Sequence, residues 1–75
     1  MTPVKQLAVP RFVVEVVFSN AGAVYGIETY PVDAAGRADA RGIALRRSED
    51  SPYDDARIPD RRRTARVRRS VMTAR

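Results

Sequence analysis

The sequence predicts a small, mainly β domain followed by a basic C-terminal segment. Three observations lead to this fold class. One run of β-branched and aromatic residues lies at 11–18, a second lies at 23–32, and the stretch between them contains asparagine and glycine. Two strand-like runs joined by a short reversal are typical of an antiparallel β-hairpin. A hairpin alone is marginally stable in water, so we expect further elements to cover it.

The first strand has the sequence Arg-Phe-Val-Val-Glu-Val-Val-Phe and follows directly after a proline. Side chains alternate along a strand, so its apolar positions fall on one face. That face holds Phe12, Val14, Val16 and Phe18. The other face mixes charged and apolar residues. We therefore expect one face in the core and a second face that is partly covered or used for contact.

The second strand follows a predicted four-residue loop at 19–22. This loop would pair Phe18 with Ala23 and Val16 with Tyr25, which places the most apolar side chains of both strands on one face. The same register sets Arg11 against Tyr30, where the guanidinium would stack on the ring.

Two residues interrupt the second strand. Pro31 has no N–H for a ladder, so this strand should end there or lie at an edge of the sheet. Gly26 indicates either a bulge or a close approach of another segment.

A third strand is expected at 42–47, after a turn at 33–36. The competing interpretation is a helix over 34–47 with Asp33 as its N-cap. Gly36 and Gly42 would cost that helix roughly 1 kcal/mol each relative to alanine, which favours the strand. Residues 1–47 would then form the β domain.

The remaining chain divides into a linker at 48–60 and an arginine-rich tail at 61–75. The linker contains two prolines and five acidic residues, which is typical of a loop. Asp60 could cap a short helix in the tail. Many arginines with almost no acidic partners make such a helix weak, so we expect the tail to be flexible or marginally helical.

The composition argues against an enzyme. The chain of 75 residues contains no cysteine and no histidine. Disulfides, thiolate nucleophiles, zinc fingers and imidazole bases are therefore excluded. The acidic residues do not follow a calcium-loop pattern. We expect no catalytic residue, no metal and no cofactor, and no run of apolar residues is long enough to cross a membrane.

The net charge of +5 is unevenly distributed. Residues 57–75 hold eight arginines against one acidic residue. Guanidinium groups bind phosphates and carboxylates bidentately, so this segment predicts non-specific contact with RNA, DNA or an acidic surface. The candidate contact residues are Arg61, Arg62, Arg63, Arg66, Arg68 and Arg69. The tail lacks aromatic residues, which argues against sequence-specific reading of RNA.

The opening Met-Thr-Pro-Val-Lys-Gln-Leu-Ala-Val-Pro, the hairpin and the arginine-rich segment resemble small transcription regulators encoded by lytic phages. The resemblance implies a protein that binds the host's bacterial RNA polymerase in the cytoplasm and redirects transcription during host takeover. It implies contacts with the N-terminal region of β′ and with the β flap. It further implies that initiation is inhibited by weakening σ association and that termination is suppressed.

Four residues outside the tail are candidates for partner binding. Lys5 and Arg11 flank an extended N-terminal arm, and Tyr30 combines an apolar ring with a polar tip. Glu28 is the fourth. The alternative function is a nucleic-acid-binding or ribosome- or virion-associated protein that acts through its arginine-rich tail. In either case we expect a monomer.

Overall fold

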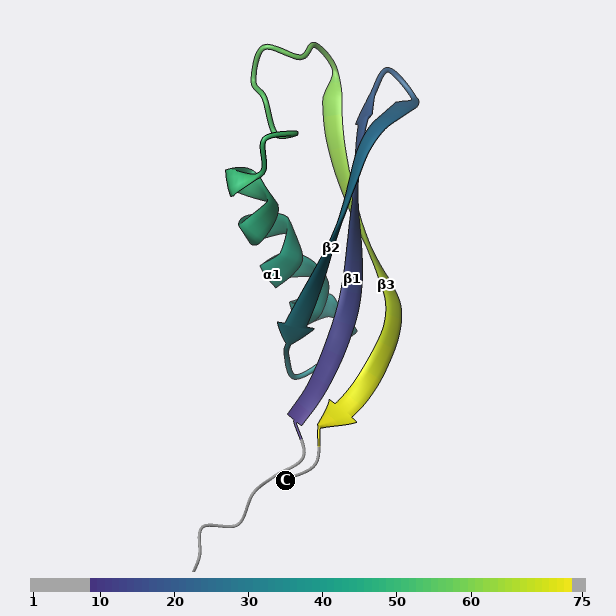
Figure 1. The fold of residues 1–75 in the computed structure, drawn as a ribbon, viewed down its shortest axis with the longest axis vertical. Helices are drawn as coiled ribbons and strands as arrows, with labels where there is room; N and C mark the ends of the chain where they lie inside the picture. The colour runs from purple at the N-terminus through teal and green to yellow at the C-terminus, as the bar shows by residue number, and fades with distance from the viewer. Residues whose placement is uncertain (1–8, 74–75) are drawn as a thin grey trace, which may run out of the picture.

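The structure is a computed structural model that describes residues 9–73. Three strands form an antiparallel sheet in the order β2-β1-β3. The elements are β1 (Val9–Asn20), β2 (Ala23–Asp33), α1 (Arg37–Arg47), the short 3₁₀ helix η1 (Ser48–Asp50) and β3 (Arg61–Thr73). Helix α1 packs against one face of the sheet (Figure 1). The mainly-β fold class and the β1–β2 hairpin are confirmed.

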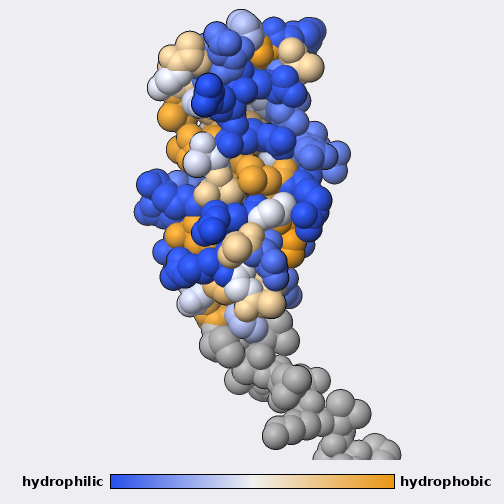
Figure 2. All heavy atoms as spheres, turned by 180° about the vertical axis from the view of Figure 1, so that it is seen from behind, coloured by the Kyte–Doolittle hydropathy of each residue, from blue (hydrophilic) through white to orange (hydrophobic). Residues whose placement is uncertain are grey.

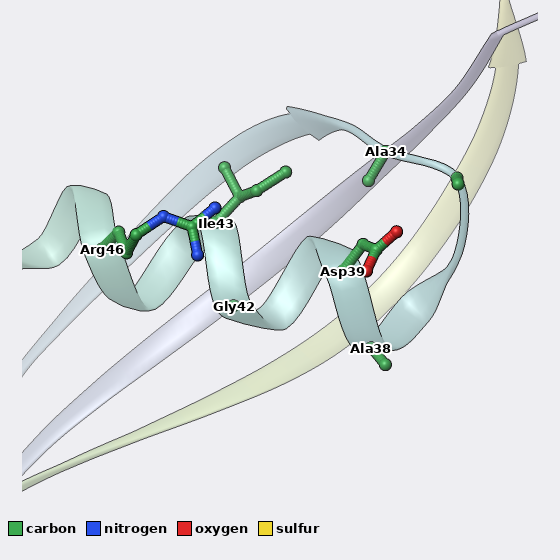
Figure 3. Close-up of a pocket in the computed structure, with 7 residues that line it drawn as sticks. Ala34, Ala38, Asp39, Gly42, Ile43 and Arg46 are labelled. Atoms are coloured by element: carbon green, nitrogen blue, oxygen red, sulfur yellow. The ribbon is translucent and has the colours of Figure 1, made fainter.

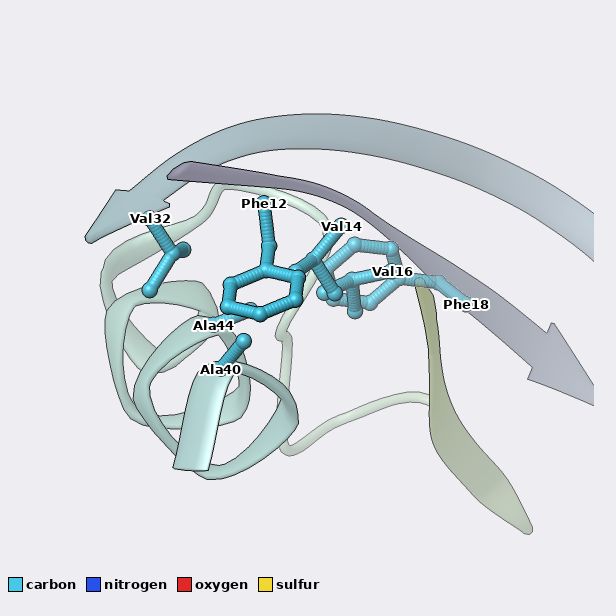
Figure 4. Close-up of a cluster of buried hydrophobic side chains, with 7 residues drawn as sticks. All are labelled: Phe12, Val14, Val16, Phe18, Val32, Ala40 and Ala44. Carbon is cyan, nitrogen blue, oxygen red and sulfur yellow. The ribbon is translucent and has the colours of Figure 1, made fainter. Parts of the chain in front are cut away.

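The core lies between β1 and α1 (Figure 4). The predicted core face of β1 is confirmed, because Phe12 is 6% exposed and the next three alternate side chains are fully buried. Val32 of β2 and two alanines of α1 complete the cluster, which consists of Phe12, Val14, Val16, Phe18, Val32, Ala40 and Ala44. The small alanine side chains are one helical turn apart, so the helix backbone can approach the sheet closely.

The hairpin turn is shorter than predicted. Ala21 and Gly22 both have positive φ angles, 48° and 87°. A two-residue turn of this kind matches the twist of the strands it joins. Asn20 therefore pairs with Ala23, where a four-residue loop had been predicted.

The register of the hairpin changes as a result. The register shifts at a bulge between Phe18 and Ser19. On the side of this bulge away from the turn, Val16 pairs with Glu28, three residues further along β2 than predicted. An odd shift moves the β2 side chains from Gly26 onward to the face opposite the predicted one. Ile27, predicted to be in the core, is 51% exposed, whereas Val32 is fully buried.

The linker explains this register. Gly26 is buried, and a Cβ atom placed on it would lie 2.7 Å from the Tyr53 ring. Tyr53 also packs on the Phe18 ring at 5.4 Å between centroids and accepts a 2.8 Å hydrogen bond at its carbonyl from the Tyr25 hydroxyl. Part of the predicted loop thus covers the sheet, and Gly26 provides the close approach.

The predicted third strand at 42–47 is wrong, and the alternative, a helix, is correct. Helix α1 begins after Gly36, which is its N-cap. Only Gly42 therefore lies inside the helix, so the expected glycine penalty is halved. Asp33 does not cap the helix, because it pairs with Arg11. Arg47, in the last turn, complements the helix dipole and donates a 2.7 Å hydrogen bond to the Pro31 carbonyl.

The third strand is formed instead by Arg61–Thr73, which had been predicted as a flexible or marginally helical tail. This strand pairs with β1 along its whole length, and Ala65 and Val67 pack against the core. β1 is the central strand, so both of its edges need a hydrogen-bonded neighbour. In β3, Ala65 and Val67 alternate with polar residues, so one face of the strand packs against the core while the other faces solvent. Residues 74–75 of the predicted tail and the N-terminal residues 1–8 lie outside the described residues.

Candidate interaction surface

The sheet has one face that α1 does not cover, which we call the open face. The strand register places one set of alternate side chains on it. β1 contributes Arg11, Val13, Glu15, Val17 and Ser19; β2 contributes Val24, Ile27, Thr29, Pro31 and Asp33; and β3 contributes Arg62, Thr64, Arg66, Arg69 and Val71.

A shallow hollow of about 390 Å³ lies on the open face. Its lining is mostly apolar on the β1 and β2 side and polar on the β3 side. The lining residues are Glu15, Val17, Val24, Ile27, Thr64 and Arg66. Val24 and Ile27 are 57% and 51% exposed, which is high for large apolar residues. The open face thus combines an apolar centre with a cationic border, the arrangement found in protein–protein interfaces.

The arginines of β3 fall into two groups, and the first group is internal. Arg63 donates hydrogen bonds to the Leu45 carbonyl at 2.9 Å and to the Ser48 hydroxyl at 2.8 Å. Arg61 pairs with Asp54 at 3.0 Å, and the same carboxylate lies 3.8 Å from Arg63. These two arginines attach β3 to the end of α1 and to the linker, so they are not available for a partner in this state.

The second group faces solvent. Arg62, Arg66 and Arg69 border the open face, opposite Ser19, Glu15 and Val13 respectively. Arg68 is the extra residue of a bulge, between the pairs formed by Val67 and Arg69. Arg66 contacts Glu15 at 3.3 Å, but its side chain is 63% exposed.

Four of the six predicted contact arginines therefore remain accessible. They are Arg62, Arg66, Arg68 and Arg69.

The predicted partner-binding residues are not brought together. Arg11 is on the open face and binds Asp33 bidentately, at 2.8 and 3.1 Å. This hydrogen bond lowers the pKa of the Asp33 carboxyl and raises that of Arg11. The predicted stacking of Arg11 on Tyr30 is wrong, because Tyr30 points to the helix side of β2. Lys5 lies outside the described residues.

Tyr30 and Glu28 do lie together, on the helix side of the sheet. The Tyr30 hydroxyl donates a short hydrogen bond to Glu28, and both side chains are half-buried. Burial, followed by the bond to the Glu28 carboxylate, raises the pKa of Tyr30 to about 12. This pair reinforces β2 and lies away from the open face.

A second hollow of about 240 Å³ lies beside α1 (Figure 3). Its lining consists of Ala34, Ala35, Ala38, Asp39, Gly42, Ile43 and Arg46. One carboxylate and one guanidinium do not form a catalytic constellation. From behind, hydrophilic side chains divide the apolar surface into small patches (Figure 2).

Within residues 9–73, no cluster of three metal-binding side chains occurs. The same residues contain no helix long and apolar enough to cross a membrane.

The sequence prediction missed Ile27 on the open face, because the predicted register assigned Ile27 to the core. The sequence does contain a signal for the observed register. Gly26 and Val32 belong to the same set of alternate β2 residues, and the glycine favours placing that set beneath a covering segment.

No protein-family model matches the chain, and no curated protein or solved structure is significantly similar to it. The open face therefore has to be interpreted from its own geometry.

Proposed function

We propose that this protein is a non-enzymatic regulator that binds bacterial RNA polymerase through the open face of its sheet and modulates transcription. The observation that carries the proposal is the apolar hollow at Val17, Val24 and Ile27, bordered by exposed arginines of β3. Apolar side chains gain nothing from a phosphate backbone, whereas a protein partner can bury them. The surface thus favours a protein partner with apolar and acidic residues.

The choice of polymerase as the partner rests on the resemblance to phage-encoded transcription regulators. In this proposal the protein acts in the bacterial cytoplasm and contacts the N-terminal region of β′ and the β flap. A σ factor is held by several surfaces, so a ligand that occupies one of them shifts the binding equilibrium. Initiation is then inhibited, and cations near the exit channel contact nascent RNA without reading its bases and suppress termination.

The test is co-migration with purified polymerase in gel filtration, first with core enzyme and then with holoenzyme. We expect a complex that releases σ. The double variant Val24→Thr with Ile27→Thr keeps strand propensity but removes the apolar centre, and it should weaken the complex at least tenfold.

The control is Ala38→Ser, a change of an exposed residue on α1. It should leave the affinity within twofold. Absence of co-migration at low salt would contradict the proposal.

Direct nucleic-acid binding is the second candidate, and the four accessible arginines of β3 favour it. Two of the six predicted contacts are engaged internally, so four phosphates would be neutralised. The plot of log K against log salt on duplex DNA should then have a slope of about −3.6. A slope near this value together with no polymerase complex would favour the second candidate.

A further inference from the structure

The two edges of the sheet differ in how they are closed. On β2, Pro31 lacks an N–H, and its carbonyl accepts a 2.7 Å hydrogen bond from Arg47. Proline is tolerated on an edge strand where its nitrogen faces away from the neighbour, and the carbonyl of the same residue faces the same way. This outer edge is therefore blocked at Pro31 by a missing donor and an occupied acceptor.

The outer edge of β3 has neither device. Residues 61–73 contain no proline and no glycine. Pairing with β1 is uninterrupted from Arg61 to Val67, up to the bulge at Arg68. Among the described residues, no hydrogen bond other than those to β1 uses the β3 backbone. Beside the lower half of β3, Figure 1 shows no helix or strand on the side away from β1. An open edge of this kind can accept an added strand.

The charges along this edge select the kind of strand. Six of the nine residues from 61 to 69 are arginine, and the four that are not engaged internally are Arg62, Arg66, Arg68 and Arg69. A second copy of β3 would place arginines against arginines, and like charges across a ladder are destabilising. The same row attracts carboxylates. The edge therefore rejects the protein's own copies and selects an acidic segment.

The alternation of β3 adds a second requirement. On the open-face side, an added strand would run beside Arg62 and Arg66. On the helix side it would run beside Ala65 and Val67, which are half-buried against the core. A matching strand alternates acidic residues with apolar ones.

From these observations we propose that β3 binds an extended, alternately acidic and apolar segment of a protein partner as a fourth strand of the sheet. This inference deepens the proposed function and rests on it for the identity of the partner. It adds a binding mode that uses backbone hydrogen bonds at the edge, next to the open face.

The first experiment uses the isotope-labelled full chain and an acetylated, amidated octapeptide of alternating glutamate and valine. In the free protein, every second amide of residues 61–67 should exchange rapidly, because those amides point away from β1. Bound peptide should slow the exchange of that set at least about tenfold. Binding that leaves these amides unprotected would overturn the proposal.

The second experiment separates backbone pairing from charge. Two versions of the octapeptide carry N-methyl groups, one on all glutamates and the other on all valines. Alternate residues of a strand expose their N–H groups at opposite edges, so one methylated peptide should bind at least tenfold more weakly than the other. Equal affinities would mean that side chains alone are recognised, which overturns the proposal.

The third experiment uses charge reversal with a matched control. Arg62→Glu with Arg66→Glu should lower octapeptide affinity at least tenfold. Arg41→Glu with Arg46→Glu makes the same change in net charge on the exposed side of α1 and should alter affinity less than threefold. Equal losses from both double variants would contradict the proposal.

Two outcomes separate this inference from the proposed function. Octapeptide protection of β3 without a polymerase complex supports strand addition and contradicts polymerase as partner. A polymerase complex in which the outward amides of β3 stay unprotected supports the proposed function and overturns strand addition. A free chain that elutes as a dimer at low salt, with the outward amides of residues 61–67 protected from exchange, would show that the edge accepts its own copy, which also overturns the proposal.

Discussion

The two faces of β1 come from alternate residues of one strand, and their surroundings differ. Phe12, Val14, Val16 and Phe18 are buried against α1 and the linker, whereas the three residues between them are only half-buried. The buried set of alternate residues is constrained by folding, whereas the other set is available for contact with a partner. On β3 the same division separates Arg63, which binds the end of α1, from its neighbour Arg62, which faces the open side.

The largest effect is expected from Phe18→Ala. Phe18 is fully buried and contacts the rings of Tyr25 and Tyr53. Loss of a buried phenylalanine costs about 3–5 kcal/mol, which is most of the stability of a domain this small. Urea unfolding followed by circular dichroism should show a largely unfolded variant. Val17→Ala, one residue away, should cost about 1 kcal/mol or less, and equal losses would invalidate the division of β1 into two faces.

Gly26→Ala tests the close contact on the helix side of β2. The new methyl group would lie 2.7–2.9 Å from three ring atoms of Tyr53, so the ring must move. Overpacking of this kind costs about 1–3 kcal/mol. In a Tyr53→Ala background the same substitution should cost much less, and a double-mutant cycle of urea midpoints measures the difference. Additive effects would mean that Tyr53 does not cover Gly26.

Arg63→Met and Arg62→Met compare the two sides of β3. Arg63→Met removes the donor to the Ser48 hydroxyl and leaves the Leu45 carbonyl with the Ser48 hydroxyl as its remaining side-chain donor, so it should lower the free energy of unfolding by about 1–3 kcal/mol. Arg62→Met should change it by less than about 0.5 kcal/mol but should weaken binding of acidic partners. Thermal unfolding and octapeptide titration of both variants provide the comparison. The prediction fails if the two variants exchange these effects.

The smallest effect concerns alkaline pH. The pKa of Tyr30 is raised to about 12 from its ordinary value of 10.0, so the folded state favours the neutral phenol. Its contribution to stability is fully present below pH 10 and is lost as the pH rises through about 12. Urea unfolding at several pH values should show a weaker alkaline decline for Tyr30→Phe than for the original protein. Parallel declines would contradict the assignment.

Local patterns in the sequence predicted the hairpin and its buried face. The alternation from Phe12 to Phe18 and the Asn-Ala-Gly reversal depend only on neighbouring residues, and both were interpreted correctly as strand and turn. The register was missed because the residue that covers Gly26, Tyr53, comes from a segment that resembles a linker. The segment that forms α1 was predicted as a strand because Gly36 was counted as a residue within the alternative helix, whereas it is the N-cap.

The assignment of β3 failed for a different reason. Its arginines were interpreted by their charge, although Ala65 and Val67 alternate with them on the side that meets the core. Strand pairing between residues far apart in the chain leaves little local signal. The candidate surface was therefore predicted only in part. Its cations and the valines of β1 were identified, but the exposure of Ile27 and the internal role of Arg61 and Arg63 required the fold.

Because β3 follows β1 by about forty residues in the chain, the nascent chain exposes β1 before its partner strand is available. A ribosome completes the valine-rich β1 well before residues 61–73 emerge, so β1 first exists as an uncovered edge with high β-propensity and little charge, a combination that promotes aggregation. Pairing with β3 replaces that edge with a charged one. Removal of residues 61–75 is therefore expected to yield an aggregating chain, whereas charge-altering substitutions within β3 should keep the sheet intact.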